Sequence, residues 1–203
     1  MMHPYATDSN ERKTVAFCFA VVGIVLAWCL SQLPRLIRIP WPWWIEIPSP
    51  FGFYVILAGV FDRWVWRWPL LRMIRIVEVP DLNGHWTGEC TSSFDQHAQK
   101  YNVQVTISQT WTKIAILLET ANSKSQSQVV GMTTREAEGV TLNYMFFNEP
   151  KEDADGRMHA HRGTTTLLLS RDGNELTGEY YSGRDRQNFG GLRLARQAKA
   201  PKN

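Results

Sequence analysis

The distribution of apolar residues divides the chain into two parts near residue 80. Before that point apolar residues come in long runs, and after it they alternate with polar residues and are interrupted by turn-forming residues. Long apolar runs are typical of helices that are buried on all sides or lie in a membrane, whereas alternation is typical of strands with one buried face. The pattern therefore predicts an N-terminal helical segment followed by an all-β domain.

The first apolar run, residues 14–30, contains no charged residue, and residues 31–33 extend it. About 20 residues of helix, at ~1.5 Å per residue, cross a hydrocarbon core of ~30 Å. We therefore predict a transmembrane helix over residues 14–33. A signal peptide is the alternative, because Arg12 and Lys13 precede the run, but no small-residue cleavage site follows it.

A second apolar run, residues 51–61, is short, but a cluster of tryptophans lies on each side of it. Tryptophan prefers the headgroup level of a bilayer, so two such clusters are typical of the two ends of a spanning helix. We predict a second span over residues 51–68, a tail over 1–13, a connecting loop over 34–50 and a linker over 69–80. A helix lying flat on the bilayer is the alternative.

Two spans would place the N-terminus and the β domain on the same side of the membrane. That side would carry six basic residues: Arg12, Lys13, Arg63, Arg67, Arg72 and Arg75. The connecting loop carries only Arg35 and Arg38 against Glu46. Because basic residues favour the cytoplasmic side, we predict a two-pass membrane protein whose N-terminus and β domain are cytoplasmic.

After residue 80, eight segments with strand-like patterns are separated by turn-forming stretches. We predict strands over residues 85–94, 101–109, 112–121, 125–134, 139–148, 161–170, 174–183 and 188–197. Consecutive strands with short connections favour a closed eight-stranded up-and-down antiparallel β-barrel over residues 81–197, followed by a tail over 198–203. A barrel of this size holds packed side chains or one small ligand. A two-sheet sandwich is the alternative.

The charges exclude one class of partner. Residues 1–79 hold 8 Lys and Arg against 5 Asp and Glu, whereas residues 80–203 hold 14 of each. The β domain is therefore neutral, and long DNA or RNA is excluded because its backbone is bound through many uncompensated cations. The chain also contains no nucleophile elbow, HExxH or phosphate-binding loop motif, so we predict that it is not an enzyme.

In an up-and-down barrel, alternate connections lie at the same end. Four connections therefore share one end of the barrel: those near residues 95–100, 121–125, 148–160 and 183–188. We call this end the distal mouth, because the chain enters the barrel at the other end. Polar and aromatic residues are concentrated in and beside these connections. We predict that the ligand-binding residues are Thr91, Ser92, Ser93, Tyr144, Asn148, His161, Tyr181, Arg184, Arg186 and Asn188.

These residue types suit a phosphorylated ligand with flat bases. Arg184 and Arg186 could pair with phosphate oxygens, hydroxyls could donate to phosphate or ribose, and tyrosines could stack on a base. The structural alternatives are that the Arg-Asp-Arg turn forms a solvated ion pair and that the serine-rich turns are only turns. His159 and His161 share a strand face but lack further ligands for a metal, so we predict neither a metal nor a cofactor.

Several motifs of the chain resemble those of one family. They are FDRWVWR (61–67), VPDLNGHWTG (79–88), TSS (91–93), SQTWTKI (108–114), LNYMFFNEP (142–150), HRGT (161–164) and GEYYSGRDRQNFGGLRL (178–194). With these motifs in this order, roughly residues 12–197 look like the membrane-anchored β-barrel effectors of bacterial CBASS antiphage systems, the CD-NTase-associated effectors.

The resemblance implies a function in antiviral defence. In such a system a cognate CD-NTase senses phage infection and makes a cyclic nucleotide messenger, here a cyclic dinucleotide or related cyclic oligonucleotide. The effector barrel binds the messenger, and the effectors then form homo-oligomers and disrupt the bacterial inner membrane, which kills the infected cell (abortive infection). The alternative of a different class is a membrane-tethered, lipocalin-like carrier of a lipid or small apolar ligand, which predicts a wide apolar interior.

Overall fold

The computed structural model describes residues 1–37, 49–152, 159–184 and 186–197, and it divides into two compact units. The barrel unit contains residues 1–9 and the chain from residue 79 onward, and the helical unit contains residues 10–78. The boundary between the two units at residue 79 thus lies close to residue 80, where the pattern of apolar residues changes. The first nine residues, however, belong with the barrel.

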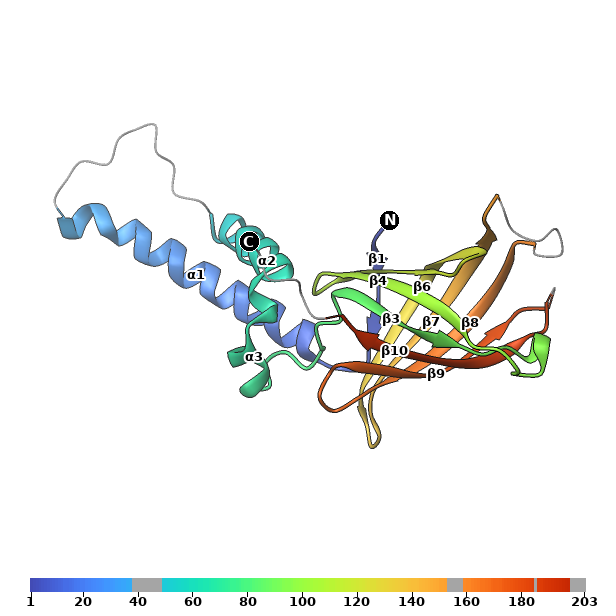
Figure 1. Cartoon of the computed structure of the whole chain (residues 1–203). Helices are drawn as coiled ribbons and strands as arrows, with labels where there is room; N and C mark the ends of the chain where they lie inside the picture. Colours follow the sequence, from blue (N-terminus) through green and yellow to red (C-terminus); the bar gives the residue numbers. More distant parts are fainter. Residues whose placement is uncertain (38–48, 153–158, 185, 198–203) are drawn as a thin grey trace, which may run out of the picture. The chain divides into compact units, whose positions relative to one another are not determined.

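Eight strands form the barrel (Figure 1): β3 (Gly84–Cys90), β4 (Tyr101–Gln109), β5 (Lys113–Glu119), β6 (Ser123–Glu136), β7 (Gly139–Pro150), β8 (His161–Leu169), β9 (Glu175–Ser182) and β10 (Phe189–Arg196). Each strand pairs antiparallel with the next along the chain, and β10 returns to pair with β3. The predicted closed eight-stranded antiparallel barrel is therefore confirmed.

Apolar side chains fill one end of the barrel interior, which we call the floor. The most deeply buried of them are at most 3 % exposed: Trp86, Val103, Val105, Ile107, Ile116, Met132, Leu142, Leu167, Leu176 and Leu194. The Trp86 indole donates to the Leu82 carbonyl oxygen (3.0 Å), and the Arg196 guanidinium lies over the Trp86 ring at 4.6 Å from its centroid. Burial of each large apolar side chain contributes about 1.5–3 kcal/mol, so the floor stabilises the barrel and leaves the opposite end for polar groups.

Two further strands come from the extreme N-terminus. β1 (His3–Pro4) pairs antiparallel with β5, and β2 (Ala6–Thr7) pairs parallel with β6. This differs from the predicted tail over residues 1–13, because a two-residue strand is too short to show an alternating pattern.

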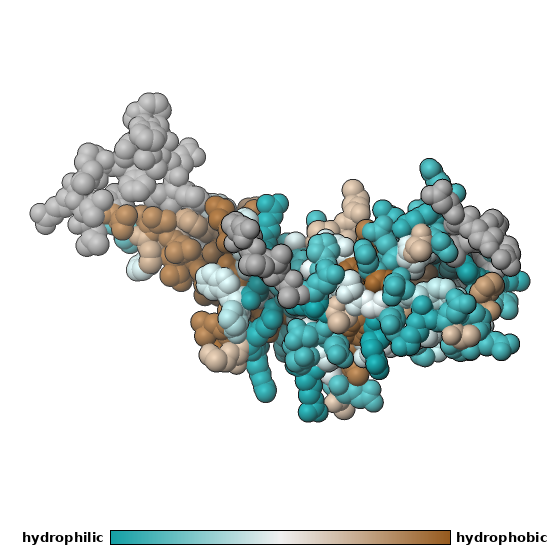
Figure 2. All heavy atoms as spheres, viewed as in Figure 1, coloured by the Kyte–Doolittle hydropathy of each residue, from teal (hydrophilic) through white to brown (hydrophobic). Residues whose placement is uncertain are grey.

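The helical unit contains α1 (Glu11–Ile37), α2 (Pro50–Arg63), the 3₁₀ helix η1 (Val65–Arg67) and α3 (Pro69–Met73). The ring of Phe19 on α1 meets the rings of Tyr54 and Phe61 on α2 edge-on, so the two helices pack against each other. The face of α1 that is visible in Figure 2 is mostly apolar. Four apolar side chains of this helix are at least half exposed: Phe17, Ile24, Val25 and Trp28. An exposed apolar helix surface of this kind is suited to contact with lipid.

Within the described residues, only α1 is long and apolar enough to cross a membrane. This differs from the predicted transmembrane hairpin of two full spans, because α2 has 14 residues, or about 21 Å of helix, against a hydrocarbon core of ~30 Å. Residues 34–37 continue α1 rather than opening the connecting loop, and residues 38–48 of that predicted loop lie outside the described residues.

Candidate ligand-binding cavity

The end of the barrel opposite the floor contains a cavity of about 900 Å³. Each of the eight barrel strands contributes to its wall, and so do the connections that were predicted to share the distal mouth. The predicted clustering of those connections is therefore confirmed. The volume falls within the ~300–1,000 Å³ that is usual for sites of small ligands and cofactors.

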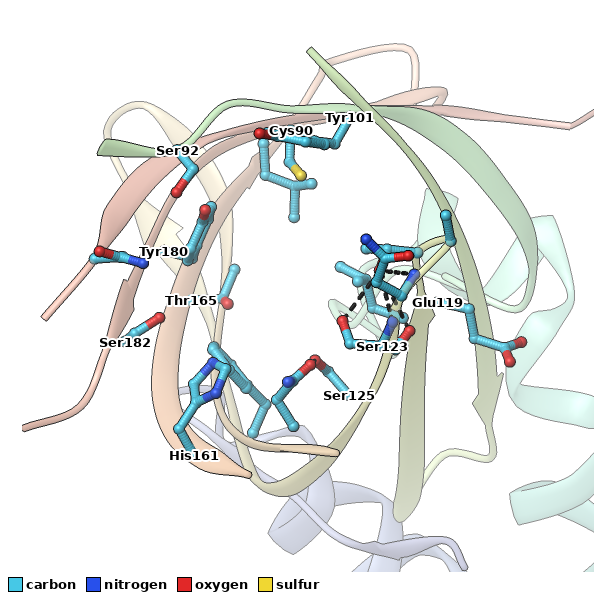
Figure 3. Close-up of a pocket in the computed structure, with 18 of the residues that line it drawn as sticks. Cys90, Ser92, Tyr101, Glu119, Ser123, Ser125, His161, Thr165, Tyr180 and Ser182 are labelled. Atoms are coloured by element: carbon cyan, nitrogen blue, oxygen red, sulfur yellow. Dashed lines mark hydrogen bonds between the residues drawn. The ribbon is translucent and has the colours of Figure 1, made fainter. Parts of the chain in front are cut away.

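Hydroxyl groups surround the cavity on several sides. They belong to Ser92, Thr120, Ser123, Ser125, Thr165 and Ser182. Figure 3 shows Ser92, Thr165 and Ser182 on one side of the cavity and Ser123 and Ser125 on the other. Hydroxyls can both donate and accept hydrogen bonds, so this wall can bind the phosphate and ribose oxygens of a nucleotide.

Asn148 lines the cavity although its side chain is only 4 % exposed. It stands opposite Ser125 on the neighbouring strand, and the Ser125 hydroxyl donates to Asn148 Oδ1 (2.7 Å). The other polar atom, Asn148 Nδ2, is buried and has no hydrogen-bond partner among the described residues. A buried donor left unpaired costs about 1–3 kcal/mol, so Asn148 Nδ2 is suited to an acceptor atom of a ligand, such as an oxygen or ring nitrogen of a base.

Aromatic rings form another part of the wall. Tyr144, Phe146 and Tyr180 line the cavity, and glycines on adjacent strands make room for two of the rings. A Cβ atom at Gly163 would collide with the Phe146 ring, and one at Gly190 would come within 2.9 Å of the Tyr180 ring. These rings offer flat faces against which the bases of a nucleotide can stack.

Tyr144 and Tyr180 of the wall are neutral at physiological pH. Burial raises the pKa of Tyr144 to about 12, although a hydrogen bond with Thr165 partly opposes this. Burial also raises the pKa of Tyr180, whose hydroxyl donates to the Thr91 carbonyl oxygen (3.0 Å). Neither phenol therefore adds a negative charge that would repel a phosphate.

The charged side chains around the cavity are mostly basic. Lys100, Lys151 and Arg186 line it, although Lys100 is paired with Glu89 (2.7 Å), and Glu119 is the acidic residue in its described lining. Figure 3 shows the Glu119 carboxylate pointing away from the middle of the cavity. The cavity therefore presents a positive balance to an anionic ligand, although the β domain as a whole is neutral.

Arg186 is held at the mouth by two neighbours. With its amide oriented so that both polar atoms are satisfied, Asn188 accepts from Arg186 Nε (3.0 Å) and donates to the Arg186 carbonyl oxygen (3.2 Å). The guanidinium also lies over the ring of Phe94, in the 3₁₀ helix η2 (Ser93–Asp95), at 5.9 Å from its centroid. These contacts orient the guanidinium while leaving further N–H groups for a phosphate.

Six of the ten residues predicted from the sequence line this cavity: Ser92, Tyr144, Asn148, His161, Arg186 and Asn188. His161 is buried, and its Nδ1 lies 3.0 Å from the His159 carbonyl oxygen. The described residues contain no group of three or more His, Cys, Asp or Glu side chains that could hold a metal ion.

The other four predicted residues lie outside the lining and have different surroundings. Tyr181 is 49 % exposed on the outer face, where it stacks on Phe189. Arg184 is exposed. Thr91 Oγ1 accepts from the Gly191 backbone N–H (3.2 Å), and Ser93 Oγ accepts from the Phe189 N–H (3.0 Å).

Several wall residues were missing from the predicted set: Tyr101, Thr120, Ser123, Ser125, Thr165, Tyr180 and Ser182. Knowledge of which residues pair on neighbouring strands would have identified some of these wall residues. If Asn148 faces inward, its partners on the neighbouring strands, Ser125 and His161, face inward too. Tyr144 lies four residues before Asn148 on β7 and therefore has the same orientation. Its partner on β8 is Thr165, which in turn pairs with Tyr180 on β9.

Cys90 also lines the cavity, and its thiol should react slowly. Burial raises the pKa of this thiol from 9.0 to about 11, and the negative charge of Asp95 adds to the effect. Because the thiolate is the nucleophile, we expect alkylation of Cys90 by iodoacetamide at pH 8 to be about 100-fold slower in the folded protein than in urea. Mass spectrometry of the Cys90 peptide measures both rates, and equal rates would contradict this prediction.

The barrel matches a known receptor family. Residues 77–196 match the family model described as "Cap15, cyclic dinucleotide receptor domain". The chain belongs to this family. The matched residues include all of the residues described above that line the cavity, so the domain that gives the Cap15 family its description is the one that contains the candidate site.

Two curated relatives carry the same name. CD-NTase-associated protein 15 of Staphylococcus schleiferi is 28 % identical over 156 residues, which cover 74 % of this chain and 79 % of that protein. CD-NTase-associated protein 15 of Yersinia aleksiciae is 27 % identical over 150 residues, which cover 73 % and 69 %. The resemblance to CD-NTase-associated effectors is therefore confirmed, and a cyclic oligonucleotide fits as the ligand of such a domain.

Proposed function

We propose that the protein is a CBASS effector whose cavity binds a cyclic dinucleotide made by a cognate CD-NTase, and that binding drives homo-oligomerisation and disruption of the inner membrane. The observation that carries the proposal is the buried Asn148 Nδ2, which has no hydrogen-bond partner among the described residues, in a cavity of hydroxyls, aromatic rings and cations inside a Cap15 receptor domain.

The cavity wall has groups for both parts of such a ligand. Arg186 and Lys151 lie where they can bind the phosphates, and the surrounding hydroxyls can complete the coordination of phosphate and ribose oxygens. The bases would stack against Tyr144, Phe146 or Tyr180, and the Asn148 amide would bind the edge of one base. Within this proposal the six predicted residues that line the cavity contact the messenger, whereas Thr91, Ser93, Tyr181 and Arg184 do not.

The N-terminal strands support a two-pass topology. Residues 3–7 pair with β5 and β6, so the N-terminus lies on the same side of the membrane as the barrel. If α1 crosses the bilayer, the chain must cross back before residue 79, because only an even number of crossings returns it to that side. In this proposal α2 belongs to the returning segment, and the excess of basic residues favours a cytoplasmic location for both ends.

The carrier alternative receives less support. A barrel that carries a lipid would have a wide apolar interior, but here many apolar side chains are packed into the floor, and hydroxyls, amides and cations stand among the aromatic and aliphatic side chains of the cavity wall. An uncharged apolar ligand would leave Asn148 Nδ2, which has no partner among the described residues, without an acceptor.

Calorimetry and thermal unfolding of the full chain in detergent test the proposed ligand. We expect at least one of cyclic di-AMP, cyclic di-GMP, cyclic di-UMP and cyclic AMP–UMP to bind, and a ligand at 100 times its Kd to stabilise the fold by about 2.7 kcal/mol. Linear dinucleotides of the same bases are the controls. If none of the cyclic compounds binds, or if the linear ones bind as tightly, the proposed ligand class is wrong.

A further inference from the structure

The barrel wall is interrupted between β5 and β6. These strands pair directly at only three positions, where residues 117–119 face residues 124–126. Past these positions the N-terminal segment lies between them: residues 3 and 4 pair with β5, and residues 6 and 7 pair with β6. We call residues 3–8 the strap.

Tyr5 fixes the middle of the strap. Its side chain is 3 % exposed, and its hydroxyl donates to the Trp111 carbonyl oxygen (2.8 Å). The same hydroxyl accepts from Gln109 Nε2 (3.4 Å), and the buried Gln109 amide also accepts from the Leu82 N–H (2.8 Å). Tyr5 thereby joins the strap to the connection between β4 and β5 and to the segment that enters the barrel.

Asp8 fixes the end of the strap. Its carboxylate accepts from the Thr134 N–H (2.8 Å), the Thr134 hydroxyl (2.9 Å) and the Arg135 N–H (3.1 Å). Slight burial acts to raise the pKa of Asp8, but these hydrogen bonds outweigh it and lower the pKa below its ordinary value. At neutral pH the carboxylate is therefore ionised and bound to the end of β6.

Ser127 links the strap to the cavity wall. Its hydroxyl oxygen accepts from the Ile116 N–H (3.0 Å) across the gap between the strands and lies 3.0 Å from His3 Nε2. Two residues before it on β6, Ser125 lines the cavity and donates to Asn148. The strap residues themselves do not line the cavity, although they bind the two strands that carry part of its wall.

We propose that the strap is the element that closes the barrel wall between β5 and β6, and that strap seating and messenger binding strengthen each other. A messenger that contacts Thr120, Ser123 and Ser125 can bind only when β5 and β6 lie side by side at the mouth. The strap can pair with both strands only when the same two strands keep a fixed spacing nearer the other end of the barrel. Two binding events that favour the same closed state are coupled positively and reciprocally. The strap is followed along the chain by α1, so strap seating and the apolar helix are linked through the backbone.

Hydrogen exchange of the full chain in detergent tests the closing role without any ligand. Asp8→Ala removes the hydrogen bonds of an exposed carboxylate, and Tyr5→Phe removes only a hydroxyl, so that one variant remains informative if the other folds poorly. We expect amides of residues 113–119 and 124–132 to exchange at least about tenfold faster in both variants. Unchanged exchange in these segments would overturn the proposal.

Asp172→Ala is the matched control. Asp172 also lies on an exposed turn, and its carboxylate accepts from Ser170 and Asn174, but it stands in the connection between β8 and β9, away from the strap. We expect exchange in β5 and β6 to be unchanged in this variant. An equal acceleration in Asp172→Ala would mean that general loosening of the barrel, rather than strap release, causes the effect, and would overturn the proposal.

The coupling rests on the proposed function and has its own readout. Among the four cyclic dinucleotides named above, we take the one that binds the unaltered protein most tightly. We expect Asp8→Ala to lower the affinity for it about tenfold, although Asp8 does not line the cavity. We expect Asp172→Ala to change this affinity less than about twofold. Unchanged affinity in Asp8→Ala would overturn the coupling. If none of the four binds the unaltered protein, the proposed ligand class fails, whereas the exchange measurement still decides whether the strap closes the wall.

Discussion

Replacement of Arg186 by alanine is expected to weaken binding of the cyclic dinucleotide by at least about tenfold, whereas replacement of Arg184 is expected to change it less than about threefold. Arg186 lines the cavity and is oriented by Asn188 and Phe94, but Arg184 is exposed outside the lining. A hydrogen bond to a charged group contributes about 1.5–3 kcal/mol, which corresponds to a loss of roughly ten- to more than a hundredfold.

The pair of arginines provides its own control. Both variants lose the same side chain within one short connection, so a difference between them reports position relative to the cavity rather than total charge. Isothermal titration of the full chain in detergent measures the affinities, and unfolding without ligand should show similar melting temperatures for both variants. Equal losses of affinity would indicate that long-range attraction, and not direct contact by Arg186, binds the phosphates.

The strands of the barrel could be predicted because alternation records which face of a strand is buried. Val103, Val105 and Ile107 alternate with polar residues on β4, and this pattern is visible without any knowledge of the partner strands. Short connections then leave few ways to join eight antiparallel strands, so the closed up-and-down order followed from the same pattern.

The individual site residues were harder to predict because register decides which residues face inward. Tyr180 and Tyr181 are adjacent, and a shift of one residue exchanges the outer face for the cavity. The register places Tyr180 opposite Thr165, inside, and leaves Tyr181 to stack on Phe189 outside. The sequence therefore predicted the connections that form the mouth but not every side chain that reaches the cavity.

The length of the second helix depended on local signals at its two ends. Ser49 caps the start of α2 by accepting from the Gly52 N–H (3.2 Å), and Pro50 occupies its first turn. At the other end, Trp68 is extended because it precedes Pro69, and the segment before it forms the 3₁₀ helix η1. The tryptophans that suggested a longer span therefore follow α2 instead of extending it.

The membrane-dependent part of the proposed function predicts a second large effect. Replacing both Val21 and Val25 by lysine is expected to remove the protein from the membrane and to abolish killing in cells that make the messenger. Both valines are exposed, one turn apart, near the middle of α1, and each central lysine costs about 2.5–3.5 kcal/mol of insertion free energy. The two substitutions together would oppose insertion by about 5–7 kcal/mol.

Fractionation with alkaline carbonate measures membrane insertion, and counts of surviving cells measure killing. The control is the double Val→Leu variant at the same positions, which should remain inserted and toxic. Messenger binding should persist in the double-lysine variant, because neither position belongs to the barrel unit. A double-lysine variant that leaves the membrane and still kills would show that cell death does not require insertion of α1. One that stays soluble, binds the messenger and is harmless would separate recognition by the barrel from damage by the helices, because the same chain would retain the first and lose the second.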